Sequence, residues 1–213
     1  MKYIATYQVI NVVTVTYLVI KYVKDRNINF AIFSYLIFGL VVEIVLAFLE
    51  KRFHRSNVIS YNLFSFGCVI FYFYFYKNVL IINYKKVYIF MIMVWFSYLL
   101  LNTIFFTGLM KLQNDTYILG MITVFIFIFL YMKNLLLIEI SKPLYSDYLS
   151  WISLGIILFF TSAFPILFFL QKLVVEAEAT RAFYNLLNFG NIFLSITFLI
   201  AALCPVKDQS HIM

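Results

Sequence analysis

Apolar runs of about 20 residues, separated by short polar breaks, follow one another along the whole 213-residue chain. A helix of this length crosses a hydrocarbon layer of about 30 Å. The pattern predicts an all-α, polytopic membrane protein, with a bundle of seven transmembrane helices in one domain, 1–205, and a short tail, 206–213. The predicted spans are about 3–23, 29–49, 57–77, 87–107, 116–133, 150–170 and 184–204.

Charged residues and prolines mark the ends of these runs. The first run closes at KDRN, 24–27, and the second at EKRFHRSN, 50–57. In the longest connection, NLLLIEISKPLYSDYLS at 134–150, Pro143 stops any extension of the fifth helix. Pro165 lies inside the sixth run and predicts a kink there.

One carboxylate, Glu43, lies inside the second run. A carboxylate in hydrocarbon costs several kcal/mol unless it is protonated, paired or hydrated, so such a side chain usually faces a bundle interior or a cavity. Glu43 is about six residues from the end of its span, roughly 9 Å deep at 1.5 Å per residue. The sequence therefore predicts that the other helices surround this position.

The uncharged polar residues of the seven spans lie preferentially in one leaflet. Seven spans put the N-terminus and the loops after spans two, four and six on one side, called side A here. The polar residues in the half near side A are Gln8, Asn11, Asn62, Ser65, Asn102, Thr116, Thr161, Ser162, Asn185, Asn188, Asn191 and Ser195. The opposite half consists mainly of Phe, Ile, Leu, Val and Tyr.

Two interpretations of this asymmetry stand side by side. In the first, the amides and hydroxyls form hydrogen bonds between helices, each contributing about 0.5–1 kcal/mol, and a protonated Glu43 bonds to an amide such as that of Asn62. In the second, a hydrated pocket opens to side A. We favour the pocket, because general interhelical bonding has no reason to avoid the other leaflet. The expected ligand-binding residues are Glu43, Asn62, Asn102, Asn185, Asn188 and Asn11.

Composition and charge narrow the class of protein. With 65% hydrophobic and 12% charged residues and a mean hydropathy of +0.98, the chain does not fit a soluble globular domain. The net charge of +7 comes from Lys and Arg at segment ends, so we expect a lipid bilayer and not nucleic acid as the partner. Seven of these residues fall on side A and nine on the opposite side, side B, which holds the loops after spans one, three and five and the C-terminus. The positive-inside rule then favours an outside N-terminus and a cytoplasmic C-terminus.

The sequence lacks the residues that several kinds of catalytic or cofactor site require. Two histidines, His54 and His211, cannot supply a multi-histidine zinc site. No glycine-rich phosphate loop occurs, and the last span has no lysine for a retinal Schiff base. Cys68 and Cys204 fall in apolar runs and are expected to be packing residues. We expect no enzyme activity, no cofactor and no metal.

Three stretches resemble a known group of proteins. They are VVEIVLAFLEKRFHRSNVISYNLFSF, KPLYSDYLSWISLGIILFF and AFYNLLNFGNIF. The chain resembles small, uncharacterised seven-helix membrane proteins abundant in Bacteroidota, many of them encoded beside sensory and signalling genes. The resemblance implies a bacterial inner-membrane sensor or signal-relay component without an output domain of its own. The richness in Phe and Tyr, 26 and 17 residues, also suits an AT-rich bacterial genome.

The function expected from these observations is that of a receptor-like or signal-relay membrane protein. It would bind a small molecule in the side-A pocket and act through a partner protein, with NYKK at 83–86 and the 134–150 connection as candidate contacts. One alternative is a small transporter or channel with Glu43 as the proton or cation site. This alternative ranks lower, because the sequence shows no polar path that continues to side B. Another alternative is a structural subunit of a membrane complex.

Overall fold

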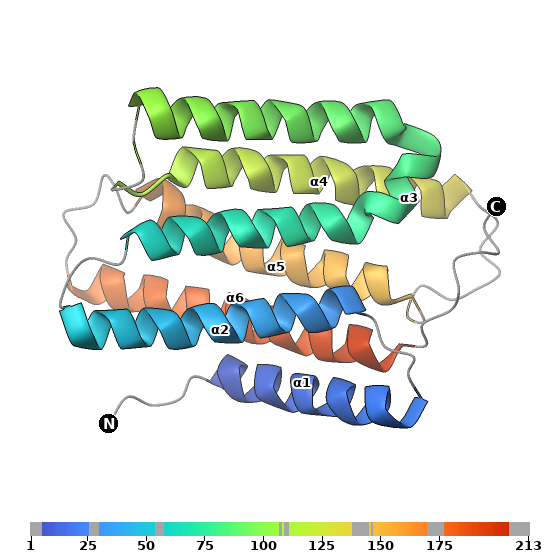
Figure 1. The fold of residues 1–213 in the computed structure, drawn as a ribbon, viewed down its shortest axis with the longest axis horizontal. Helices are drawn as coiled ribbons and strands as arrows, with labels where there is room; N and C mark the ends of the chain where they lie inside the picture. Colours follow the sequence, from blue (N-terminus) through green and yellow to red (C-terminus); the bar gives the residue numbers. More distant parts are fainter. Residues whose placement is uncertain are drawn as a thin grey trace. The chain divides into compact units, whose positions relative to one another are not determined.

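The structure, a computed structural model, is helical in the parts that it describes, residues 6–25, 30–53, 58–106, 108, 111–137, 145, 147–169 and 177–204. These parts contain no strand, as the sequence predicts. The helices are drawn in Figure 1. They are α1 (Thr6–Asp25), α2 (Phe30–Phe53), α3 (Val58–Leu101), the π-helical turn η1 (Asn102–Phe106), α4 (Asn114–Leu137), α5 (Tyr148–Phe169) and α6 (Ala177–Leu203).

Four helical stretches of the described chain are long and apolar enough to cross a membrane. They are Tyr61–Phe106, Asn114–Leu137, Tyr148–Pro165 and Asn185–Leu203, and Phe30–Val42 is a shorter apolar stretch. Large apolar side chains point outward on these helices, as Phe90, Phe129 and Leu136 do. Such surfaces suit lipid better than water, so the fold is compatible with the predicted membrane protein.

The longest helix, α3, folds back on itself. Its backbone leaves the helical region at Tyr84, with φ −131° and ψ 30°. In a straight helix Phe66 and Trp95 would lie about 43 Å apart at 1.5 Å per residue, yet their ring centroids are 6.5 Å apart. Figure 1 shows the first half (58–83) and the second half (85–101) running antiparallel. We call this arrangement the α3 hairpin.

The α3 hairpin changes the number of separate helices relative to the prediction. The predicted spans 57–77 and 87–107 both fall in the α3 and η1 stretch, and the expected connection between them, 78–86, is helical except at Tyr84. This segment contains neither glycine nor proline, so nothing in it ends the first half early. The described residues therefore form six α-helices, of which α3 contains two of the predicted spans.

The chain divides into two compact units, which we describe separately. Unit 1 comprises Met1–Ile37 and Ser141–Met213, and unit 2 comprises Phe38–Ile140. In unit 1, α6 packs against both α1 and α5. Small residues allow the α5 contact, because a Cβ on Gly155 would collide with Thr197, and one on Gly190 would lie 2.9 Å from Cβ of Ser162.

Unit 2 is built around the contact of the α3 hairpin with α4. Trp95 is 2% exposed, and its ring meets the Phe73 ring edge-on at 5.3 Å. The Phe73 ring also meets Phe127 of α4 at 5.4 Å. Tyr88 donates a buried hydrogen bond of 3.0 Å to the Phe73 carbonyl, which joins the two halves of the hairpin directly. These contacts pack both halves of the α3 hairpin against each other and against α4.

Candidate functional site

A buried polar network occupies the end of unit 2 where α3 begins, η1 ends and α4 begins. Asn62, one turn into α3, is 3% exposed. Its Nδ2 donates to the Lys111 carbonyl at 2.8 Å, and its Oδ1 accepts from the backbone N–H of Gln113 at 3.0 Å. One amide thus satisfies two backbone groups of the segment that leads into α4. These two hydrogen bonds hold the segment against the start of α3.

Gln113 and Thr116 extend the network to the other end of α3. Gln113 donates through Nε2 to the Gly108 carbonyl at 3.0 Å and to Thr103 Oγ1 at 3.1 Å. Thr116 Oγ1 lies 3.4 Å from Gln113 Oε1 and accepts from Asn102 Nδ2 at 2.7 Å. All these groups belong to unit 2. Asn62 and Asn102 are therefore linked through Gln113 and Thr116.

The local backbone explains how these side chains meet. The α3 hairpin returns the chain to the level at which it started, and η1 then widens the last turn of the helix. The N–H of Gly108 bonds to the Asn102 carbonyl at 3.3 Å, and Gly108 has a φ of +67°. Glycine adopts this left-handed conformation without steric cost. The chain can therefore leave the helix sharply and place Gln113 beneath Asn62.

Tight packing holds the network from the α4 side. The indole Nε1 of Trp95 donates to the Thr116 carbonyl at 3.1 Å. A Cβ added to Gly120 would lie 2.7 Å from this nitrogen and 2.8 Å from Cγ1 of Val69. Only a residue without a side chain allows α4 to approach both halves of α3 so closely. Gly120 thus sets the distance at which Thr116 reaches Asn102.

The structure brings together two of the six residues that the sequence proposed as ligand-binding. Asn62 and Asn102 share the network, but the bonds of their amides that we describe go to groups of the protein itself. Glu43 lies in α2 by its backbone, and its side chain is outside the described residues, as is the tail 206–213. The expected bond between Glu43 and Asn62 thus stays a prediction.

The three remaining candidates belong to unit 1. Asn185 and Asn188 are exposed on α6. Asn11 of α1 is half-buried, and its Oδ1 is buried without a hydrogen-bond partner. Ligand binding by these residues stays a prediction as well.

Several hydroxyl groups on the helices, among them Thr161 and Ser162 of the predicted polar half, bond to their own helix. Ser162 Oγ donates to the Leu158 carbonyl at 2.8 Å, and Thr161 Oγ1 donates to the Ile157 carbonyl at 2.9 Å. Thr14, Thr16, Ser34, Thr123 and Ser153 donate in the same way to the carbonyl four residues earlier. A hydroxyl satisfied in this way needs no partner on another helix.

Sequence reasoning missed Gln113 and Thr103. Gln113 lies in the polar break GLMKLQND and was assigned to a loop, although it is 3% exposed. Its position three residues before Thr116, at the start of a helix, was the available signal. Among the described residues, no group of three or more His, Cys, Asp or Glu side chains could hold a metal ion. The network offers amide and hydroxyl groups as hydrogen-bond donors and acceptors.

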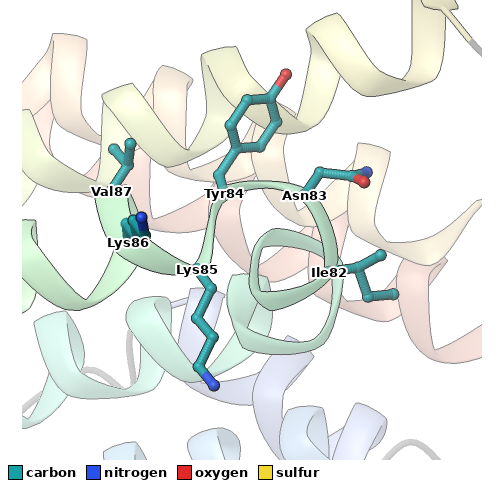
Figure 2. A pocket seen from close by; sticks show the side chains of 6 residues that line it. All are labelled: Ile82, Asn83, Tyr84, Lys85, Lys86 and Val87. Atoms are coloured by element: carbon teal, nitrogen blue, oxygen red, sulfur yellow. The ribbon is translucent and has the colours of Figure 1, made fainter.

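A second feature of unit 2 lies at the turn of the α3 hairpin. Six consecutive residues, from Ile82 to Val87, surround an open hollow of about 300 Å³. Figure 2 shows their side chains, with Tyr84 and Lys85 pointing in opposite directions from the turn. Asn83, Lys85 and Lys86 are exposed. The hollow thus has basic and amide groups at its edge.

Comparisons of the chain with protein families, with curated proteins and with solved structures found no match.

Proposed function

We propose that this chain is a seven-pass membrane protein of the receptor-like or signal-relay kind, acting through a partner protein in a bacterial inner membrane. The supporting observation is the buried network of Asn62, Gln113, Thr116 and Asn102, which ties residues 108 and 111–113 to both ends of the α3 hairpin. A satisfied polar network favours one arrangement of its elements, and breaking it is costly. It is therefore suited to a two-state switch.

The count of seven passes takes the two halves of α3 as separate crossings. At 1.5 Å per residue, residues 58–83 span about 39 Å and residues 85–106 about 33 Å. Either length is sufficient for a hydrocarbon core of about 30 Å. With α1, α2, α4, α5 and α6, the proposed total is seven. In this arrangement the polar network and the Tyr84 turn lie at opposite surfaces of the membrane.

The proposed ligand acts on the closed network. A small molecule with a donor and an acceptor can replace the Lys111 carbonyl and the Gln113 N–H as partners of Asn62. Binding would then release the connection from α3. The effect requires that the ligand bind the released form more tightly than the closed form, because only differential affinity shifts such an equilibrium. The orientation proposed from the lysine distribution places this end outside the cell.

The test is ligand binding to the purified chain in detergent, wild type and Asn62→Leu. Small polar metabolites are screened for a rise in the thermal midpoint, and hydrogen exchange of the Gln113 amide is followed with each hit. We expect a ligand that stabilises the wild type and at the same time speeds exchange at Gln113. Asn62→Leu should exchange fast without ligand and respond to none. A ligand that stabilises both proteins equally, without changing this exchange, would contradict the proposal.

The transporter and structural-subunit alternatives rest on the sequence alone. No contact of the described residues favours either one. Transport that is abolished in Glu43→Gln would replace the receptor proposal with the transporter.

A further inference from the structure

Most residues that line the hollow at the turn of the α3 hairpin carry a side-chain hydrogen-bond donor. Of its six lining residues, Asn83, Tyr84, Lys85 and Lys86 carry side-chain donors, and none of the six is acidic. The two ammonium groups are exposed, so they are free of the desolvation cost of buried charges. Figure 2 shows Asn83 and Lys85 extending to different sides of the turn. A site of this composition is suited to an anion.

More basic side chains lie at the same end of unit 2. Lys77 is exposed two turns before Tyr84, and Lys133 is exposed on α4. The ring contact between Tyr76 and Tyr131, 6.0 Å between centroids, shows that these parts of α3 and α4 lie side by side. Together with Lys85 and Lys86, they form a group that we call the turn lysines.

No acidic side chain that the structure describes in unit 2 lies beside the turn lysines. Among the described side chains of unit 2, Asp115 is the one carboxylate, and it lies in the first turn of α4, at the end of the polar network. The described charges of the unit are therefore separated, with the positive ones concentrated around the hollow. Such a concentration attracts anions and raises their local concentration.

One buried amide at this end also lacks an acceptor. Asn134 is 8% exposed, and its Nδ2 has no hydrogen-bond partner in the part of the chain that the structure describes. It follows Tyr131 by about one helical turn, which places it beyond the Tyr76 contact in the direction of the Tyr84 turn. A buried donor without a partner is costly, and an acceptor oxygen from a ligand or water would remove this cost.

We propose that this end of unit 2 is a binding site for a phosphate oxyanion, carried by an anionic phospholipid headgroup or by free phosphate. Lys85 and Lys86 supply the charge, Asn83 supplies a neutral donor, and Asn134 donates to a phosphate oxygen or to a water bound to it. A lipid headgroup as the ligand rests on the proposed function, in which both halves of α3 cross the membrane. The turn between them then lies at the depth of the headgroups. The phosphate chemistry itself does not depend on the crossing.

The test uses the full-length chain in a neutral detergent, where membrane orientation plays no part. Short-chain phosphatidylglycerol, phosphatidylcholine of the same chain length, and inorganic phosphate are titrated separately. Native mass spectrometry counts bound lipids, and the thermal midpoint reports binding of each probe. We expect phosphatidylglycerol to bind at least about five-fold more tightly than phosphatidylcholine, because a lysine near an anionic lipid contributes about 1 kcal/mol, or five-fold.

Three variants locate the site. Lys85→Gln and Lys86→Gln should each weaken phosphatidylglycerol binding about five-fold. Lys111→Gln removes the same charge from an exposed side chain at the opposite end of the unit, so it should change binding little. Equal binding of the two lipids together with no protection by inorganic phosphate, or equal losses in Lys111→Gln and Lys85→Gln, would overturn the proposal. A rise in the thermal midpoint with inorganic phosphate that is lost in Lys85→Gln and Lys86→Gln would support the site. It would also identify free phosphate as the ligand.

Asn134→Leu separates binding from folding. It removes an unsatisfied buried donor, so the thermal midpoint without lipid should stay the same or rise. Phosphatidylglycerol binding should nevertheless weaken, a combination that a purely structural role does not produce. Unchanged affinity in Asn134→Leu would overturn the role of Asn134. Failure of the lipid tests would leave the polar network and the proposed switch untouched, because these lie at the other end of the unit.

Discussion

The conformation of the polar end of unit 2 depends on the side-chain amide of Asn62. It bonds to two backbone groups, the Lys111 carbonyl and the Gln113 N–H, at 2.8 and 3.0 Å. A backbone group that loses its partner in a buried place costs about 1–3 kcal/mol. The side chain therefore stabilises a loop conformation in addition to any role in binding.

Substitution of Asn62 should destabilise the chain strongly. In Asn62→Leu, both backbone groups lose their partner, so we expect a loss of about 2–4 kcal/mol in the free energy of unfolding. Chemical unfolding in mixed micelles measures it. Asn78→Leu is the matched control, because Asn78 is exposed on the same helix and its loss should cost less than about 0.5 kcal/mol. Equal losses in the two variants would refute the structural role of Asn62.

Gly120 provides a second test at the residue scale. A Cβ at this position would lie 2.7 Å from the Trp95 indole nitrogen, so Gly120→Ala should force α4 and α3 apart and cost about 1–3 kcal/mol. Gly39→Ala is the control, because a Cβ at Gly39 meets nothing within 4 Å and should stabilise the helix by about 0.5–1 kcal/mol. Thermal midpoints of the two variants should therefore move in opposite directions. A rise in both would refute the close approach.

The sequence predicted that polar residues gather at this end of unit 2, but it did not predict their hydrogen-bond partners. The depths of Asn62 and Asn102 along their runs placed both near one side, and both are in the network. Their partners could not be read from the pattern, because Gln113 lies in a polar break whose conformation depends on Gly108 and on the return of α3. Whether Asn11, Asn185 and Asn188 bind a ligand stays a prediction.

At the scale of elements, the α3 hairpin determines the geometry of unit 2. Apolar run lengths predicted helices at both of its halves, and the structure has helices there. The predicted connection was too long, because residues 78–83 favour a helix as much as the run before them. The reversal at Tyr84 depends on aromatic contacts between the halves, which a local pattern does not contain.

The direct bond between the two halves is testable. Tyr88→Phe removes the hydroxyl that donates to the Phe73 carbonyl and keeps the ring against Phe127. We expect a loss of about 1 kcal/mol in unfolding free energy, the usual value for one hydrogen bond. Tyr98→Phe, at an exposed tyrosine of the second half, serves as the control and should have almost no effect. No difference between the two variants in chemical unfolding would contradict the contribution of this bond.

At the scale of the whole molecule, the described surface is apolar on most helices. Val23, Ile44 and Phe129 are each more than two-thirds exposed, which water would penalise and lipid would not. Composition predicted this property, since it follows from the number of apolar residues and not from their arrangement. The sequence predicts the orientation in the membrane only weakly, because the Lys and Arg counts on the two sides differ little.

The proposed double crossing of α3 places positions 83 and 111 on opposite sides of a membrane. The most direct measurement is labelling of Asn83→Cys and Lys111→Cys by a membrane-impermeant maleimide in intact and permeabilised cells. The background replaces Cys68 and Cys204, which are both buried, with alanine. We expect Lys111→Cys to react in intact cells and Asn83→Cys to react only after permeabilisation. Labelling of both positions in intact cells, or of neither, would contradict the account.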